Sequence, residues 1–208
     1  MSADGRLGAR ATKRKQEIAK RVCAAAEARL SEGFTVASMS IEQLVADAGV
    51  PRSTFYVYFS DKAAVFREVL DQFADFTVQT IVRASDPLSV TQDHLRSALA
   101  LGVSHYGEHQ GTYRLLADAA ATEPSMATIY KNATDRVIVA LARTVAQWGG
   151  RTRPNRRDRT LASALIWMVE RTLYQELNRA VGVSEQGLID ALTAVIWPVA
   201  QAERHTQP

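Results

Sequence analysis

The chain has 208 residues, of which 47% are hydrophobic, so it has material for one large domain or for a small domain attached to a larger one. No stretch approaches the roughly 18 uninterrupted apolar residues of a membrane span, and the first 20 residues lack the apolar run of a secretory signal, so we expect a cytoplasmic protein. The net charge of +3 identifies no partner, and the single Cys23, which excludes an internal disulfide, is expected to be buried.

Basic residues gather at the start of the chain. Met1 to Arg21 contains seven basic and two acidic residues, a balance of +5, which suits contacts with nucleic-acid phosphates. For residues 1–10 a contacting arm and a solvated tail are equally consistent with the sequence. Lys13 and Arg14 adjoin a first helix expected at about 12–32, so we expect these two side chains to contact phosphates.

A helix-turn-helix is predicted between Ser40 and Lys62. Ser40 and Gln43 have the spacing of a capping box, so a helix should begin at Ile41. Gly49 ends this helix in a tight turn, and a short second helix follows Pro51. On that helix the spacing predicts that Phe55 and Phe59 point into the core. The outward residues are then Arg52, Ser53, Thr54, Tyr56 and Tyr58.

This segment resembles the DNA-binding signature of the TetR family of repressors, in which an Ala-Gly-Val turn precedes a short recognition helix, an aromatic residue and a lysine. The residues that carry the resemblance are Ala48, Gly49, Val50, Thr54, Tyr56, Tyr58, Phe59 and Lys62. The family implies a protein that binds palindromic double-stranded DNA as a homodimer. Pro51 departs from the pattern, because the family more often has Ser or Thr at that position.

Each outward residue of the predicted reading helix has an expected role toward DNA. Arg52 is the candidate for bidentate contact with a guanine, and Ser53 and Thr54 are candidates for a thymine methyl or a phosphate. The residues expected to hold phosphates are Ser40, Tyr56, Tyr58 and Lys62.

The rest of the chain keeps a helical pattern, so the predicted fold is all-α with about nine helices. A helix at about 60–83 should connect an N-terminal arm and helix-turn-helix domain (residues 1–60) to a ligand-binding and dimerisation domain (61–208). Ser85, Asp86 and Pro87 should end the connector helix. Further helices are expected at about 91–108, 112–121, 124–148, 158–178 and 184–201. The arginine-rich segment 151–159 is interpreted as a solvated loop.

The last two predicted helices are apolar on nearly all sides, which indicates cover by a partner subunit. The family implies that this pair forms the four-helix interface of a homodimer. Pro198 should kink or end the last helix.

The family also implies an effector pocket in the C-terminal domain. The residues expected to line it are Tyr106, Tyr113, Leu116, Met126, Tyr130, Ile166, Val169, Glu170, Leu173, Tyr174 and Trp197. Trp148 and Trp167 likewise combine a large apolar surface with a polar tip, which suits a ligand cavity. Any one of these side chains could instead pack in a core. The segment Trp167–Leu173 resembles that of the ethionamide-repressor subgroup, although Val169 replaces an asparagine that hydrogen-bonds ligands there. We therefore expect a small apolar effector, and neither a cofactor nor a metal.

The sequence thus predicts a ligand-responsive transcriptional regulator, a repressor released from its operator by the effector, and not an enzyme. One alternative is an architectural DNA-binding protein without an effector. The other is a helical metal-dependent enzyme, because His105 and His109 lie four residues apart with Glu108 between them. The order of these residues does not match the zinc-protease helix, and no third ligand is evident.

Overall fold

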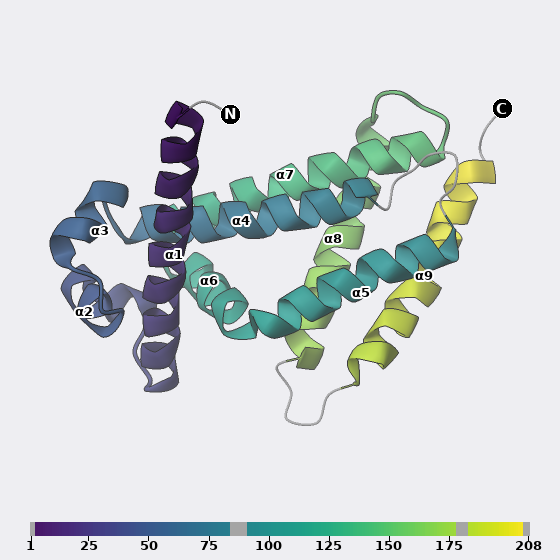
Figure 1. Cartoon of the computed structure of the whole chain (residues 1–208). Helices are drawn as coiled ribbons and strands as arrows, with labels where there is room; N and C mark the ends of the chain where they lie inside the picture. The colour runs from purple at the N-terminus through teal and green to yellow at the C-terminus, as the bar shows by residue number, and fades with distance from the viewer. Residues whose placement is uncertain (1–2, 84–90, 178–182, 206–208) are drawn as a thin grey trace. The chain divides into compact units, whose positions relative to one another are not determined.

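The computed structural model describes residues 3–83, 91–177 and 183–205, with the backbone alone for residues 3–8 and 205 (Figure 1). These residues form helices and no strand. The helices are α1 (Ala3–Ser31), the short 3-10 helix η1 (Val36–Ser38), α2 (Ile41–Asp47), α3 (Arg52–Tyr58), α4 (Lys62–Arg83), α5 (Gln92–Glu108), α6 (Gln110–Thr122), α7 (Pro124–Trp148), α8 (Arg156–Leu177) and α9 (Glu185–His205). The all-α prediction is confirmed.

The helix-turn-helix begins and turns as the sequence predicts. Ser40 Oγ accepts a hydrogen bond from the Gln43 amide at 3.2 Å, and Gln43 Oε1 accepts one from the Ser40 amide at 3.1 Å, which forms the capping box of α2. Gly49 has a φ of 60°, a conformation that favours glycine, and allows the tight turn into α3.

Two helix ends differ from the expectations. Helix α1 begins at Ala3 instead of near residue 12, so the basic segment that precedes Lys13 continues the helix. Helix α9 runs through Pro198 to His205, so of the two predicted effects of this proline the helix end is excluded, and a kink stays a prediction. Pro198 and Ala194, whose carbonyl loses its usual partner, are both exposed, so solvent can hydrate that carbonyl. The predicted helix breakers Asp86 and Pro87 and the expected helix end at Asn178 lie outside the described residues.

Cα packing divides the chain into two compact units. Unit 1 contains residues 1–73 and 111–133, and unit 2 contains residues 74–110 and 134–208. Helices α4 and α7 have residues in both units. These packing units differ from the expected functional domains 1–60 and 61–208, because α6 and the start of α7 group with the N-terminal helices. The functional division stays a prediction.

Unit 1 packs α2 against α1, with α3 following the turn (Figure 1). Ile18 of α1, Phe55 of α3 and Val65 of α4 are almost completely buried, as is Leu115 of α6. The apolar stripe of α1 therefore supports the helix-turn-helix from behind, as its spacing predicts.

In unit 2, α5 packs extensively along α9, and both also contact α8 (Figure 1). A group of charged side chains fixes the start of α8. Asp158 is completely buried, and its Oδ1 lies 2.6 Å from Nη2 of Arg151. Glu203 of α9 is also buried and pairs with Arg157 at 2.7 Å and with Arg151 at 3.4 Å. Part of the segment 151–159, which was predicted to be a solvated loop, therefore belongs to an ionic cluster around two buried carboxylates.

No helix in the described ranges combines the length and the apolar character that a membrane crossing requires.

Candidate nucleic-acid interface and effector cavity

The short helix α3 has one buried and one exposed side. Phe55 is 1% exposed, and the adjoining Phe59 is 2% exposed. Arg52, Ser53 and Tyr56 are exposed, whereas Thr54 and Tyr58 are half-buried. Arg52, Ser53 and Tyr56 therefore face solvent, as the spacing predicts, whereas Thr54 and Tyr58 do so only in part. Their individual roles toward DNA stay predictions.

The guanidinium of Arg52 already has contacts within unit 1. Its Nη2 lies 2.9 Å from Oε1 of Glu42 in the first turn of α2. Its Cζ lies 5.6 Å from the ring centroid of Tyr56, one turn further along α3, a distance that allows cation–π attraction. The candidate base-reading group is therefore held by side chains of both helices of the motif.

Arg21 of α1 holds the turn between these helices. Its Nη2 donates hydrogen bonds to the carbonyl oxygens of Ala48 and Gly49, the latter at 2.8 Å. A Cβ at position 49 would lie 2.9 Å from the same nitrogen, so glycine also makes room for the arginine. Nearby, a hydrogen bond to Asp47 raises the pKa of Arg29.

The other expected phosphate contacts occupy different settings. Lys13 and Arg14 are exposed on α1, and Arg14 pairs with Glu17 at 3.1 Å. Ser40 is exposed, although its hydroxyl oxygen caps α2. Lys62 is half-buried, and its ammonium donates hydrogen bonds to the carbonyl oxygens of Val36 and Met39, each at 2.9 Å. The position of Lys62 indicates that it supports the motif from within.

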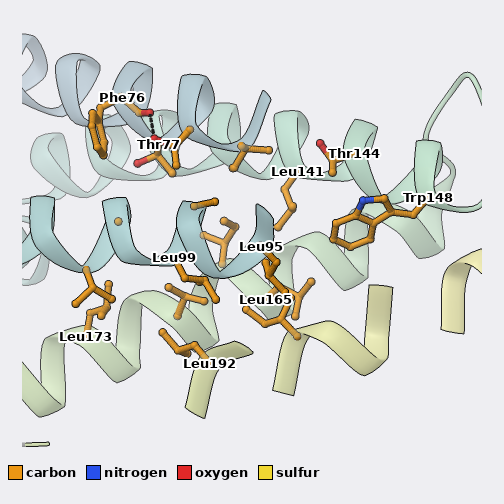
Figure 2. A pocket seen from close by; sticks show the side chains of 18 residues that line it. Phe76, Thr77, Leu95, Leu99, Leu141, Thr144, Trp148, Leu165, Leu173 and Leu192 are labelled. Carbon is orange, nitrogen blue, oxygen red and sulfur yellow. Dashed lines mark hydrogen bonds between the residues drawn. The ribbon is translucent and has the colours of Figure 1, made fainter. Parts of the chain in front are cut away.

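Unit 2 contains an apolar cavity of about 160 Å³ (Figure 2). Five helices line it, and none of the lining side chains is charged. The lining residues are Phe76, Thr77, Thr80 and Ile81 of α4, Leu95, Ala98, Leu99, Gly102 and Val103 of α5, Leu141, Thr144 and Trp148 of α7, Leu165, Ile166, Val169 and Leu173 of α8, and Leu192 and Ile196 of α9.

Hydrogen-bonding capacity at this cavity is low. The hydroxyl of Thr80 donates to the carbonyl of Phe76 at 2.9 Å, and that of Thr144 donates to the carbonyl of Ala140 at 3.5 Å. Figure 2 shows the side chains of Leu99, Leu165 and Leu192 on neighbouring helices around the space. Such a lining favours an uncharged, mainly apolar ligand.

Four residues considered for a pocket line this cavity: Trp148, Ile166, Val169 and Leu173. The other expected residues are not among its lining residues. Tyr113, Leu116, Met126 and Tyr130 belong to unit 1, where Tyr113 stacks on Phe73 with a centroid distance of 4.5 Å. These residues were assigned to the pocket from the sequence because burial in a core and burial around a ligand require the same residue types.

The remaining expected pocket residues lie in unit 2. Tyr106 of α5 is buried, Glu170 and Tyr174 of α8 are half-buried, and the guanidinium of Arg171 lies 5.3 Å from the Tyr174 ring centroid. Trp197 packs against the cluster of Val145, Trp148 and Ala200. Whether any of these residues contacts an effector stays a prediction.

The sequence-based interpretation missed the contributions of α4 and α5. Thr77 and Thr80 lie on a helix that was assigned only a connecting role. On α5, Leu95, Ala98, Leu99 and Gly102 have the i, i+3, i+4, i+7 spacing of a buried stripe. A glycine inside this apolar stripe was the sequence signal that could have indicated open space beside α5. In the structure, a Cβ at Gly102 would meet no atom within 4 Å.

The two histidines considered as metal ligands lie next to an aromatic ring. His105 stacks on Phe76 with a centroid distance of 3.9 Å and meets the edge of His109 at 4.6 Å. Within the described parts of the chain, no three His, Cys, Asp or Glu side chains are grouped as metal ligands would be.

A helix-turn-helix with an exposed second helix, in one chain with a helical unit that contains an apolar cavity, is the arrangement of DNA-binding transcriptional regulators. Comparison with known proteins specifies the family. Residues 24–69 match the family model for "Bacterial regulatory proteins, tetR family", and residues 95–200 match that for "Transcriptional regulator EthR, C-terminal domain". The chain belongs to the TetR family and is a transcriptional regulator.

Relatives agree over most of the length. The chain is 30% identical over 200 residues to the HTH-type transcriptional regulator EthR of Mycobacterium tuberculosis strain H37Rv. The aligned region covers 93% of this chain and 90% of that protein. It is 28% identical over 177 residues to EthR of Mycolicibacterium smegmatis, with 81% and 79% covered.

Solved structures support the fold. A TetR-family regulator from Syntrophomonas wolfei superposes with a TM-score of 0.72 at 17% identity, over 91% of this chain and 95% of that chain. One from Mesorhizobium loti gives 0.67 at 19% identity, over 92% and 97%.

Proposed function

We propose that the protein is a ligand-responsive repressor that binds a palindromic operator as a homodimer and is released by a small apolar effector. It acts in the cytoplasm through binding equilibria and not through catalysis. The observation that carries the proposal is the cavity of unit 2, which five helices line without a charged side chain.

The cavity argues for an effector because its lining is apolar surface that a ligand would cover. A ligand bound in this partly open space of about 160 Å³ would remove that surface from water. An uncharged molecule would gain by burial there, whereas a charged one would lose its hydration without finding a partner. The effector is therefore mainly apolar.

A homodimer follows from the form of the reading surface. One helix of seven residues offers few base contacts, so specific binding requires two copies on a two-fold site. On the expected interface helices α8 and α9, Trp167 is 45% exposed and Val195 is 52% exposed. Large apolar side chains on both helices support burial against a second subunit.

Release would be an effect of differential affinity. Helix α4 is continuous from Lys62 to Arg83; its first part belongs to unit 1, and Phe76, Thr77, Thr80 and Ile81 at its end line the cavity. An effector that favours one position of α4 would favour one arrangement of the reading helices, and the operator would bind that arrangement less well.

The experiment combines operator selection with effector screening. Genomic fragments retained by the purified protein are sequenced to give the operator, and uncharged apolar compounds are screened for a rise in thermal stability. The proposal expects a two-fold symmetric site and compounds that both raise the melting temperature and weaken operator binding. Gly102→Leu, which adds a side chain at a position that lines the cavity, should reduce effector affinity at least tenfold. Compounds that stabilise the protein without weakening operator binding would refute the coupling.

The architectural alternative predicts a packed C-terminal core and weak sequence preference. The cavity counts against it. If the genomic fragments that the protein retains share no common sequence, the architectural alternative would be favoured again.

A further inference from the structure

The contact between Glu42 and Arg52 joins the two helices of the DNA-binding motif at the candidate base-reading residue. We propose that Glu42 is a specificity-determining residue: its carboxylate positions the Arg52 guanidinium for a base edge and disfavours contacts of the same group with phosphates. The inference rests on the proposed role of Arg52 in reading DNA.

A series of contacts leads from the core to this pair. The ring of Phe55, which is 1% exposed, meets Tyr56 edge-on, with centroids 5.3 Å apart and an interplanar angle of 87°. The Arg52 guanidinium lies 5.6 Å from the Tyr56 centroid, and Glu42 Oε1 lies 2.9 Å from Arg52 Nη2. The guanidinium therefore contacts both an aromatic ring that packs on a buried phenylalanine and a carboxylate on the other helix.

Positioning matters because Arg52 has a long, flexible side chain. Ordering such a side chain on binding costs conformational entropy, and a group that is already oriented loses less. The closest contact of the pair joins Arg52 Nη2 to Glu42 Oε1, and the guanidinium carries five N–H donors in all. Bidentate contact with O6 and N7 of a guanine needs two of them. Glu42 can thus orient Arg52 without occupying its reading edge.

The charge of Glu42 acts in the same direction. Non-specific binding depends on contacts between cations and phosphates, and a carboxylate beside the guanidinium weakens this attraction on every sequence. The side chains of Arg52 and Glu42 are 63% and 52% exposed, so the pair is accessible to a duplex and to salt. Specificity is the difference between correct and incorrect sites, and it grows when the incorrect sites are penalised.

The test uses the full-length protein and the operator obtained by selection. Glu42→Gln keeps the size and an amide oxygen but removes the charge. Binding of wild type, Glu42→Gln, Arg52→Ala and the double variant is measured on the operator, on duplexes with each base pair changed, and on random duplex, over a range of salt. Glu32→Gln is the matched control, because it removes an exposed charge from the turn that follows α1 in the same unit.

We expect Glu42→Gln to bind random duplex about twofold to fivefold more tightly. Its discrimination at the single base pair read by Arg52 should fall about threefold to tenfold. In the Arg52→Ala background, Glu42→Gln should leave discrimination unchanged, and Glu32→Gln should leave it unchanged in either background. Circular dichroism and melting curves confirm that the variants are folded.

Two negative results are distinguishable. If Arg52→Ala loses discrimination at one base pair but Glu42→Gln keeps it, the role of Glu42 is refuted while that of Arg52 stands. If Arg52→Ala keeps discrimination at every position, the reading role of Arg52 fails, and the inference about Glu42 fails with it.

Discussion

The ammonium of Lys62 lies 2.9 Å from the carbonyl oxygen of Met39, which directly precedes the N-cap residue of α2. A second hydrogen bond of 2.9 Å reaches the carbonyl of Val36, and Glu123 Oε1 is 4.0 Å away. Lys62 therefore ties the start of α4 to the segment that leads into the helix-turn-helix.

Lys62→Met should lower the free energy of unfolding by about 1 to 3 kcal/mol, because it leaves the carbonyl groups of two buried residues, Val36 and Met39, without their charged donor. Urea denaturation followed by circular dichroism measures the change. Lys20→Met, at an exposed position of α1, is the control and should change stability little. Equal stability of the two variants would show that the contacts of Lys62 are dispensable.

Arg52→Ala should weaken operator binding by about 1 to 3 kcal/mol and relax the preference at one base position. Lys13→Ala should instead weaken binding to all sequences alike and reduce the salt slope by about one, because phosphate contacts carry no base information. Fluorescence anisotropy with the operator and with random duplexes, at several salt concentrations, separates the two effects. Equal losses on both duplexes for both variants would reject this division of roles.

Gly102→Leu should stabilise the protein by about 1 kcal/mol or more and reduce effector affinity at least tenfold. Leucine is a better helix former than glycine, and its side chain enters open space beside the cavity. Gly102→Ala is the matched control, since it gains helix propensity with little loss of volume. Thermal melting with and without effector provides both quantities. An unchanged effector response in Gly102→Leu would place the effector elsewhere.

Asp158→Asn should destabilise the protein by about 1 to 3 kcal/mol. The buried carboxylate lies 2.6 Å from Arg151 Nη2, and its other oxygen accepts a hydrogen bond from the Asn155 amide at 2.8 Å, so its removal leaves Arg151 less compensated. We take the low end of the usual cost because Arg151 is partly exposed. Asp93→Asn, an exposed first-turn acid of α5, is the control. Similar unfolding curves for both variants would contradict this prediction.

Cys23 should resist thiol reagents in the folded protein. Burial, with a smaller contribution from the charge of Glu27, raises the pKa of the Cys23 thiol from 9.0 to about 12. Little thiolate is present near pH 8, so labelling should require unfolding. The unfolded thiol ionises first, so the Cys23 contribution to stability should be lost as the pH rises from 9.0 towards about 12. Labelling at equal rates with and without urea would contradict the burial.

The sequence by itself determined the helices and the helix-turn-helix, because their signals are local. The Ser40 capping box, Gly49 in the turn and the four-residue spacing of Phe55 and Phe59 each act within a few residues of the chain. The resemblance to the TetR family depended on the same short segment.

Only the tertiary structure decided which apolar side chains surround a cavity and which polar groups meet. Ile166 lines the cavity whereas Leu116 packs in unit 1, although both satisfy the same helical spacing. The contacts of Lys62 with Val36 and of Arg52 with Glu42 join residues on separate elements. Spacing along one helix fixes the side on which a residue lies, but the partner on that side depends on how the helices pack.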